Sequence, residues 1–552
     1  MDSHQQAASQ EQAASQEQAA SQAQAASQDD VFRLLADPET HGLDDGGDHK
    51  VRRIDTHAAA VFLAGDIVFK VKRAVKYPFL DYSTLDKRKA ACLAELDINR
   101  AFAPQLYRRV VPITLEASGA LALDGTGEPV EWAVEMARFD ENKTLDRLAA
   151  RGRLSDTLTR KLAAEVAAMH ARAQPVEPNA WIAAVQGFIT ENTAAFRAAA
   201  LHVPGDLFPA HLIDLLDHKS LATYRRLHPL LTARGALGLV RRGHGDLHLG
   251  NIAILDGEPV AFDALEFDPI FASGDVLYDL GFLLMDLVER DLAGAANDVL
   301  NGYFTATRRI EDCDGIAALP FFMSLRAAIR AKVTAARLPL AQAEDRDKIA
   351  RAAKTYFKLA LDLLTEVKPV VVCTGGLSGT GKSVLARALA PLLPPLPGAL
   401  VFRSDVERKL LHGVGEHDKL PAEAYRPEVT EKIYHILSDK TARVARAGYS
   451  AVADAVFAGP KERAAIEMAA RAAGADFHGL FLVADLPTRL ARVGARGPDA
   501  SDADAAVAQK QEEYAVGDVT WEIIDASDSP AATLGQARAE IARKASGATE
   551  TR

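Results

Sequence analysis

Residues 244–266 read His-Gly-Asp-Leu-His-Leu-Gly-Asn-Ile-Ala-Ile-Leu-Asp-Gly-Glu-Pro-Val-Ala-Phe-Asp-Ala-Leu-Glu. The second half of this stretch predicts a β-hairpin. Residues 252–255 form a short apolar strand, Asp256-Gly257 is a strong turn signal, and residues 260–262 form the return strand. Asp263 ends the return strand, twelve residues beyond Asn251. A polar loop therefore precedes a hairpin that ends in an acid.

The loop has the spacing of a kinase catalytic loop, in which a His precedes an Asp by two residues and an Asn follows that Asp by five. Phosphoryl transfer needs an acceptor hydroxyl aimed at the γ-phosphate and divalent metal to neutralise the developing charge. Asp246 is the candidate base for that hydroxyl. Asn251 and Asp263 are candidate Mg²⁺ ligands, because Mg²⁺ takes hard oxygen ligands and few carboxylates. We expect His244 and His248 to brace the loop. The alternative is an acidic turn before an ordinary hairpin.

The stretch resembles the aminoglycoside-phosphotransferase-like kinases, whose loop has Gly where protein kinases have Arg. It is most similar to a bacterial branch of that group that is often fused to a second kinase-like module. The resemblance implies a bilobal, protein-kinase-like fold, the cofactors ATP and Mg²⁺, and a hydroxyl acceptor. An aminoglycoside is only one acceptor in the range of this family, and a fold does not name its substrate.

The small lobe is expected at about residues 30–135. Strands are expected at 58–63 and 67–71, with Lys70 and Lys72 on one face of the second strand. A kinase needs one strand Lys to hold the α- and β-phosphates, pinned by a helix Glu. Aligning the hairpin turn with the family favours Lys70, with Lys72 as the alternative, and Glu95 in the helix expected at 85–102 is the candidate partner. No Gly-rich loop precedes this Lys, and Thr-His-Ala-Ala at 56–59 stands in its place.

The large lobe is expected at about residues 136–367, with residues 136–139 as the hinge that meets adenine. By the resemblance, Asp275 braces the catalytic loop. Glu266, three residues beyond Asp263, is a candidate to contact the metal or the acceptor. Residues 318–366 predict helices only. They carry a basic segment, for which a solvated face with acidic partners is the favoured interpretation and a surface for an anionic acceptor is the alternative: Arg326, Arg330, Lys332 and Arg337.

A second module is expected at residues 368–552. An apolar strand at 370–373 is followed by a P-loop and then by a helix at 384–390, which is the order that this motif requires. The glycines let backbone N–H groups close around phosphate at the helix N-terminus. Lys382 is expected to reach the β- and γ-phosphates and Ser383 to ligate Mg²⁺. The candidate nucleotide-binding residues are Gly376, Leu377, Ser378, Gly379, Thr380, Gly381, Lys382 and Ser383.

Further strands are expected at 401–405, 450–456, 481–485 and 521–525, and their alternation with helices predicts a doubly wound parallel sheet. Asp454 is the Walker-B-type acid and a candidate Mg²⁺ ligand. The module resembles small P-loop kinases of the gluconate-kinase, polynucleotide-kinase and zeta-toxin kind. That resemblance implies that Asp405 is the acceptor-side base and that Arg489, Arg492 or Arg496 clamps phosphate from a lid. Asp405 as a helix N-cap is the alternative.

The whole-chain properties fit this interpretation. Residues 5–28 are four copies of an Ala-rich polar unit, so a disordered tail is expected at 1–29. A net charge of −11 argues against nucleic-acid and anionic-membrane partners. Three scattered cysteines, no spanning apolar run and no signal peptide favour the cytoplasm. We therefore expect a bifunctional ATP-dependent phosphotransferase acting on small-molecule hydroxyls. The alternatives are that one module is a regulatory ATPase, or that the second is a nucleic-acid end kinase. The oligomeric state is not indicated.

Overall fold

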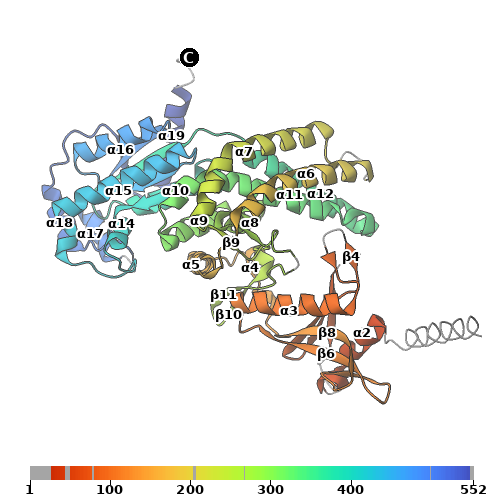
Figure 1. The fold of residues 1–552 in the computed structure, drawn as a ribbon. Helices are drawn as coiled ribbons and strands as arrows, with labels where there is room; N and C mark the ends of the chain where they lie inside the picture. The colour runs from red at the N-terminus through yellow and green to blue at the C-terminus, as the bar shows by residue number, and fades with distance from the viewer. Residues whose placement is uncertain are drawn as a thin grey trace, which may run out of the picture. The chain divides into compact units, whose positions relative to one another are not determined.

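The structure is a computed structural model that describes residues 27–43, 50–56, 58–77, 80–202, 207–266, 268–495, 497 and 499–547. The predicted tail lies almost wholly outside these residues, as do His57 and Arg496. The described residues form two compact units (Figure 1). The first runs to Gly152 and includes His244–Asp246 and Gly250–Ala272, and the second holds the remainder. No helix among the described residues combines the length and the apolar character needed to cross a membrane.

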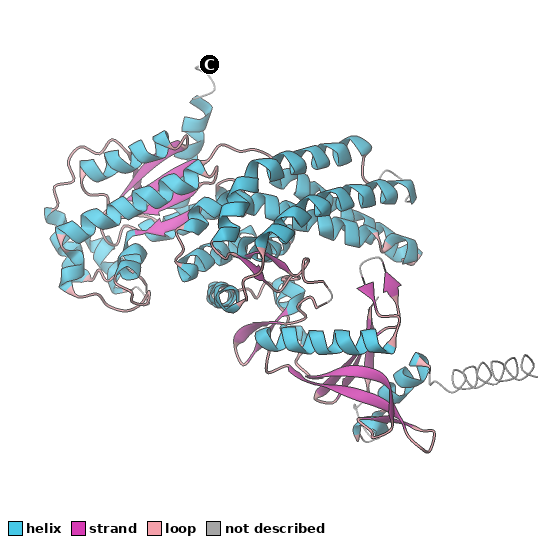
Figure 2. Cartoon of the chain, viewed as in Figure 1, coloured by secondary structure: helices cyan, strands magenta, loops and turns pink. Residues whose placement is uncertain are grey.

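The first unit contains a six-stranded sheet in the order β1-β2-β3-β8-β6-β7, drawn in magenta in Figure 2. The strands predicted near residues 58–63 and 67–71 are confirmed, and all pairings in this sheet are antiparallel. The strands are β1 (Arg52–Asp55), β2 (Ala59–Ala64), β3 (Ile67–Lys72), β6 (Tyr107–Leu115), β7 (Leu121–Leu123) and β8 (Glu128–Ala137).

The two faces of β3 enter different hydrophobic cores. Phe69 and Val71 pack with residues of α2 (Gln28–Ala36), whereas Val68 packs with residues of α3 (Leu85–Phe102). Because side chains alternate along a strand, Lys70 and Lys72 lie on the α3 face with Val68. Helix α3 has the predicted bounds, and it begins where the Thr84 side chain accepts a hydrogen bond from the Lys87 N–H.

The predicted hairpin is present in the first unit as β10 (Ile252–Leu255) and β11 (Glu258–Ala261), with Ile252 opposite Ala261. Asp256 and Gly257 both have positive φ, as a two-residue type I′ turn requires. The prediction that Asp263 ends the return strand is wrong, because β11 stops at Ala261. Asp263 lies two residues further on, in the left-handed region at φ 62°.

The second unit begins with a helical region. The helical prediction for residues 318–366 is confirmed, with a short 3₁₀ turn between two helices. Strands β9 (Val240–Arg242) and β12 (Ser273–Asp275) pair antiparallel just before and after the catalytic stretch. The helices are α5 (Asp156–Arg172), α6 (Pro178–His202), α7 (Ala210–Ala236), α8 (Val276–Glu289), α9 (Ala293–Thr307), α10 (Glu311–Gly315), α11 (Leu319–Ala335) and α12 (Ala343–Leu363).

The same unit contains a parallel five-stranded sheet in the order β14-β15-β13-β16-β17. The predicted α/β fold class is confirmed for this part of the chain. The strands are β13 (Val370–Gly375), β14 (Leu400–Arg403), β15 (Ala451–Asp454), β16 (Asp476–Val483) and β17 (Glu522–Asp525). The helices are α13 (Lys382–Leu389), α14 (Ser404–Leu411), α15 (Pro427–Arg446), α16 (Pro460–Ala472), α17 (Leu486–Gly494), α18 (Ala505–Lys510) and α19 (Pro530–Gly547).

Helix α9 binds the edge strand of this sheet through two asparagine side chains. Asn297 and Asn301 both donate to the Ala399 carbonyl, at 3.0 and 3.2 Å, and the Val401 N–H donates to Asn301 Oδ1 at 2.7 Å. The Asn301 amide therefore pairs with β14 as a neighbouring strand would, and it satisfies backbone groups that an edge strand leaves open. The module boundary predicted near residue 368 lies within this one compact unit.

We predict that Asn301→Leu lowers the free energy of unfolding of the second unit by about 1–3 kcal/mol, because it leaves the Val401 N–H without an acceptor. Urea denaturation followed by circular dichroism measures this change. Gln186→Leu, the same kind of replacement at an exposed position of α6, is the control and should stay within about 0.5 kcal/mol of wild type. Equal effects of the two replacements would contradict the prediction.

Candidate active sites

The catalytic loop and the hairpin hold the first candidate site together. Asn251 Nδ2 donates to Asp246 Oδ2 at 3.0 Å and to the Asp246 carbonyl at 3.1 Å. The Phe262 N–H donates to the Asn251 carbonyl at 2.9 Å, which extends the hairpin ladder by one pair. Asp246 is therefore hydrogen-bonded to Asn251, and Asn251 is hydrogen-bonded to Phe262, the residue before Asp263.

His244 braces this arrangement, as the sequence predicted. Its Nε2 donates to the Phe262 carbonyl at 2.9 Å, and its own carbonyl accepts from the Leu265 N–H at 3.0 Å. Its ring also contacts that of Phe102 at the end of α3, with a centroid distance of 5.5 Å. The imidazole is fully buried. These contacts fix the start of the catalytic loop to the residues that follow β11 and to the end of α3.

Glu95 lies between the two strand lysines. Lys70 Nζ is 2.8 Å from Glu95 Oε1, and Lys72 Nζ is 2.5 Å from Glu95 Oε2. Although burial favours the protonated acid, the two ammonium groups lower the pKa of Glu95 to about 2. Glu95, predicted to pair with Lys70 or, as the alternative, with Lys72, therefore pairs with both.

The two lysines differ in their second contact. Lys70 reaches Asp263 Oδ1 at 2.6 Å, and the side chains of Lys70 and Asp263 are 15% and 45% exposed. Lys72 instead pairs with Glu266, and both of these side chains are buried. Glu266 also accepts from the Tyr82 hydroxyl at 2.9 Å. Lys70 is thus the lysine whose second partner, Asp263, is open to solvent, and its role in holding phosphate stays a prediction.

Both ammonium groups are held charged. Burial opposes the charged form of Lys70, but the carboxylates of Asp263 and Glu95 raise its pKa well above the ordinary value. Burial acts in the same way on Lys72, and Glu95 and Glu266 raise its pKa. Glu266, which the sequence placed near metal or acceptor, is therefore engaged by Lys72 and Tyr82 in this structure.

The large-lobe acid that bonds the catalytic loop is Asp286. Its Oδ2 accepts from the Leu249 N–H at 3.0 Å. Asp275, to which the resemblance gave this role, instead binds Arg234 through both oxygens, at 2.6 and 2.8 Å, and caps the start of α8. The sequence signal for Asp286 was an acid inside a strongly apolar helix, which needs a polar partner when buried.

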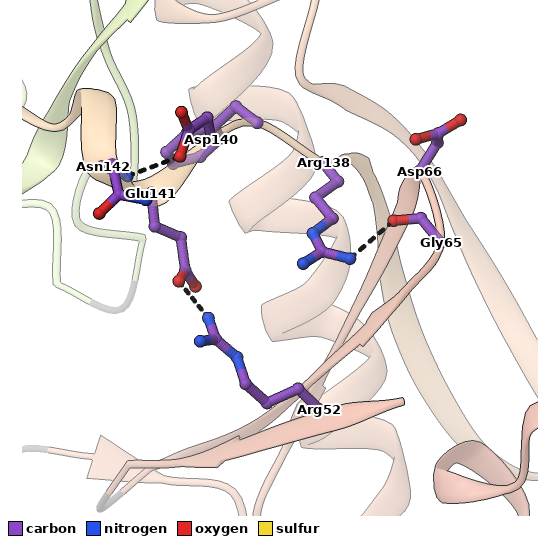
Figure 3. A pocket seen from close by; sticks show the side chains of 8 residues that line it. Arg52, Gly65, Asp66, Arg138, Asp140, Glu141 and Asn142 are labelled. Carbon is purple, nitrogen blue, oxygen red and sulfur yellow. Dashed lines mark hydrogen bonds and ion pairs between the residues drawn. The ribbon is translucent and has the colours of Figure 1, made fainter. Parts of the chain in front are cut away.

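A polar hollow of about 450 Å³ lies in the first unit where β8 runs into the predicted hinge (Figure 3). Arg52 and Glu141 form an ion pair at one side, and Arg138 donates to the Gly65 carbonyl at 2.9 Å at the other. The lining residues are Arg52, Gly65, Asp66, Arg138, Phe139, Asp140, Glu141 and Asn142. The predicted hinge residues 138 and 139 therefore face an open space.

The P-loop has the backbone shape that the motif requires. Gly376, Gly379 and Gly381 have positive φ of 133°, 87° and 92°. A Cβ at Gly379 would lie 2.5 Å from the Arg489 carbonyl oxygen, so only glycine fits there. Lys382, the first residue of α13, donates to the Leu377 carbonyl at 3.0 Å and so folds back over the loop.

Ser383 and Asp454 meet at the carboxyl ends of the parallel strands. Ser383 Oγ donates to Asp454 Oδ2 at 2.6 Å, and Thr374 Oγ1 donates to Asp454 Oδ1 at 3.3 Å. Asp454 is buried. A hydroxyl and a carboxylate side by side are hard oxygen ligands and fit Mg²⁺. Across the described residues, no cluster of three or more His, Cys, Asp or Glu could hold a metal on its own.

Sequence reasoning missed Arg403, which ends β14 beside this pair. Its guanidinium lies 3.4 Å from Asp454 and 2.7 Å from Asp499. Asp405 lies in the first turn of α14, so its predicted place in a strand is wrong, and it is not the N-cap, which is Arg403. Burial raises the pKa of Asp405, while Arg403 opposes that rise. In the sequence, Arg403 lies two residues before the predicted base Asp405. Only the fold shows that its guanidinium faces Asp454 and Asp499.

The two lid arginines that the structure describes are bound to backbone carbonyls. Arg489, which is buried, donates to the Ser378 carbonyl and to the Ala508 carbonyl, both at 2.9 Å, and pairs with Glu512. Arg492 donates to the carbonyl of Ala526 at 2.7 Å. In this arrangement Arg489 braces the P-loop rather than projecting into it, and the phosphate clamp stays a prediction for both.

Two protein-family models match segments of this chain. The sequence model of the phosphotransferase enzyme family matches residues 80–313, and that of an AAA domain matches residues 371–516. The chain is a kinase-type phosphotransferase. Its two matched segments contain the catalytic loop with its hairpin and the P-loop, respectively.

Similar proteins span both segments or one of them. An uncharacterised protein of Mycobacterium tuberculosis is 29% identical over 467 residues, which cover 82% of this chain and 88% of that protein. A choline kinase structure from Cryptosporidium parvum is 12% identical, covers 57% of this chain and 88% of its own, and has a TM-score of 0.35. A gluconokinase structure from Sinorhizobium meliloti is 18% identical, covers 34% and 99%, and has a TM-score of 0.25.

Glu95→Gln should remove an acid-sensitive part of the stability of the first unit. The pKa of Glu95 is about 2 when folded and 4.5 ordinarily, so its contribution, on the order of 3 kcal/mol, is complete above about pH 4.5. It is lost as the pH falls toward 2. We therefore expect the difference in unfolding free energy between wild type and Glu95→Gln to shrink from pH 7 to pH 3 in urea titrations. Glu128→Gln, an exposed control on β8, should cause no such pH-dependent difference; a pH-independent gap for Glu95→Gln would contradict the assignment.

Gly379→Ala should weaken nucleotide binding at the P-loop at least tenfold, because the new Cβ collides with the backbone of Arg489 and the φ of 87° is strained for alanine. Titration with a fluorescent ATP analogue measures the affinity. Gly494→Ala is the matched control, since a Cβ there meets nothing within 4 Å. The loop geometry would be contradicted if both variants bound nucleotide as wild type does.

Proposed function

We propose that this chain is a bifunctional ATP-dependent phosphotransferase that passes the γ-phosphoryl group to hydroxyl groups of small molecules at two separate sites. One observation carries the proposal. Lys70 is ion-paired with both Glu95 and Asp263, in the same unit in which Asp246 is bonded to Asn251. A strand lysine, a helix glutamate and a loop acid joined in this way are the parts that a kinase uses to hold and align nucleotide phosphates.

At the first site, Asp246 is proposed to orient the acceptor hydroxyl and to accept its proton. The Asn251 amide supports this role, because its Nδ2 holds the carboxylate at 3.0 Å in one orientation. Lys70 is proposed to bind the phosphates, and the polar hollow beside the hinge to receive part of the nucleotide. Asn251 and Asp263 would hold Mg²⁺ there, and the bound ion would neutralise charge that develops on the transferred group. The half-exposed carboxylate of Asp263 supports this assignment, because it is open to a ligand.

At the second site, Lys382 and the P-loop backbone are proposed to hold the phosphates of another ATP. Ser383 and Asp454 are its proposed Mg²⁺ ligands, a choice supported by their 2.6 Å contact. Asp405 is proposed as the acceptor-side base. It is half-buried, two residues beyond Arg403, whose guanidinium contacts Asp454. The positive charge of Arg403 favours the deprotonated, proton-accepting form of Asp405 against the effect of burial.

The two sites can be tested separately. Asp246→Asn should lower transfer at the first site by about 10²–10⁴-fold while nucleotide binding there persists, because only the base is lost. Lys382→Ala should abolish turnover at the second site alone. The measurement follows label from γ-labelled ATP into a metabolite pool, with each single variant and the double variant compared with wild type.

Matched controls keep this test specific. Asp256→Asn changes an acid in the hairpin turn whose positive φ asparagine tolerates, and Lys461→Ala changes an exposed lysine of α16. Both should retain wild-type transfer. ATP turnover that survives in the double variant would show that the assigned residues are not the active ones. Competition by oligonucleotide ends for the second activity would favour a nucleic-acid end kinase over a metabolite kinase.

A further inference from the structure

The proposed metal ligand Asp263 has a backbone conformation that is uncommon for a residue with a side chain. Its φ of 62° lies in the left-handed region, where the Cβ is crowded. Glycine would adopt this conformation without strain, but it carries no carboxylate. Such a conformation persists only where the surrounding structure holds it, and it is often found at functional sites. The contacts that hold the backbone of Asp263 therefore also set the direction of its carboxylate.

One of these contacts comes from the side chain of Asn99, which lies on helix α3. The Ala264 N–H donates to Asn99 Oδ1 at 2.8 Å, and Asn99 Nδ2 donates back to the Ala264 carbonyl at 3.3 Å. Asn99 and Ala264 are both fully buried. The amide thus binds both backbone groups of the residue after Asp263, as a neighbouring β-strand would. Because buried backbone groups need a partner, removing this amide would leave them unsatisfied.

The amide of Asn99 is itself fixed to α3. Its Nδ2 also donates to the Glu95 carbonyl at 3.0 Å, one helical turn earlier. The Glu95 carboxylate contacts Lys70, the proposed phosphate-binding lysine. One helix therefore carries both the partner of that lysine and the side chain that holds the residue after Asp263. Asparagine is a weaker helix former than alanine or leucine, so the helix alone gives no reason for an amide at this buried position.

Two other segments of the first unit hold the same stretch. The Asp263 N–H donates to the hydroxyl of Tyr107 on β6 at 3.1 Å, and the Tyr107 side chain is buried. The Leu265 N–H donates to the His244 carbonyl at 3.0 Å. The N–H groups of Asp263, Ala264 and Leu265 are thus bound by β6, by α3 and by the start of the catalytic loop, respectively. All of these segments belong to the first unit.

We propose that Asn99 is a positioning residue of the first site, which fixes the backbone around Asp263 so that its carboxylate is aimed at Mg²⁺. Because α3 also carries Glu95, a shift of this helix disturbs the lysine and the metal ligand together. Divalent metal and nucleotide therefore bind cooperatively at the first site, since each favours the helix position that the other requires. This inference rests on the proposed function of the first site, and it adds a residue that the kinase motifs in the sequence do not contain.

The first test measures metal binding without turnover. Mn²⁺ is titrated into the full chain in a Lys382→Ala, Ser383→Ala background with a non-hydrolysable ATP analogue, and free Mn²⁺ is followed by electron paramagnetic resonance. Asn99→Leu keeps the size of the side chain without its hydrogen bonds, and should raise the dissociation constant for Mn²⁺ about tenfold or more. Asp97→Leu, on the exposed face of α3, should leave it unchanged. Equal binding by Asn99→Leu, or no Mn²⁺ binding by the parent, would overturn the inference.

A second variant separates positioning from packing, and it decides the question even if Asn99→Leu fails to fold. Tyr107→Phe keeps the buried ring and removes only the hydroxyl that accepts from the Asp263 N–H. It should raise the Mn²⁺ dissociation constant about three- to tenfold. Thr114→Val, which removes another buried hydroxyl from β6, is the control and should not. Equal effects of Tyr107→Phe and Thr114→Val would overturn the inference. So would an equal loss of affinity for Mn²⁺ and for the metal-free analogue, because that would show a purely structural role.

A transfer measurement in the same background separates this inference from the proposed function. In Asn99→Leu, the Mg²⁺ concentration for half-maximal transfer from γ-labelled ATP should rise about tenfold or more, and saturating Mg²⁺ should restore most of kcat. Asp246→Asn should not be restored by Mg²⁺, because it lacks the base. Asp246-dependent transfer with an unchanged Mg²⁺ requirement in Asn99→Leu would overturn the inference and leave the proposed function in place. Absence of Asp246-dependent transfer in the parent would refute the proposed function, while the Mn²⁺ titration would still report on Asn99.

Discussion

The first unit depends on one buried carboxylate shared by two cations. Glu95 is fully buried, and each of its oxygens faces a different lysine of the same strand. Burying a carboxylate is costly unless it is paired, so the positions of α3 and β3 are tied to each other. Lys70 also pairs with Asp263, and Phe262, the residue before Asp263, is hydrogen-bonded to Asn251. Asn251 in turn is hydrogen-bonded to Asp246. The geometry of the candidate site thus follows from one ion-pair cluster.

In the second unit, the P-loop is held in place by a close backbone contact. There the constraint is steric, because Gly379 lies against the backbone of Arg489, whose side chain in turn holds the Ser378 carbonyl. The Ser378 N–H donates to Gln511 Oε1 at 2.6 Å. A phosphate that uses this N–H must displace Gln511, which belongs to the segment just after α18. The amides of Asn297 and Asn301 fix the edge of the same sheet to α9.

Most of the fold could be predicted from local patterns. The hairpin was marked by Asp256-Gly257, the end of α3 by the following Pro104, and the second sheet by alternating strands and helices around the P-loop. Partners that come from distant segments could not be predicted. Nothing local indicated that Glu95 contacts both lysines, that Asp286 rather than Asp275 bonds the loop, or that Arg489 turns toward backbone carbonyls. Arg326 was expected on a solvated face, but the packing of α8 against α11 buries it.

The central claim is that the chain holds nucleotide at two separate places. The most direct measurement is the binding stoichiometry of a non-hydrolysable Mg·ATP analogue on the full chain, determined by equilibrium dialysis. The account predicts two molecules bound per chain, and one per chain when Lys382 is replaced by alanine, because the cluster of Lys70, Glu95 and Asp263 is then unchanged. A wild-type stoichiometry of one, or complete loss of binding on replacing Lys382 alone, would contradict it.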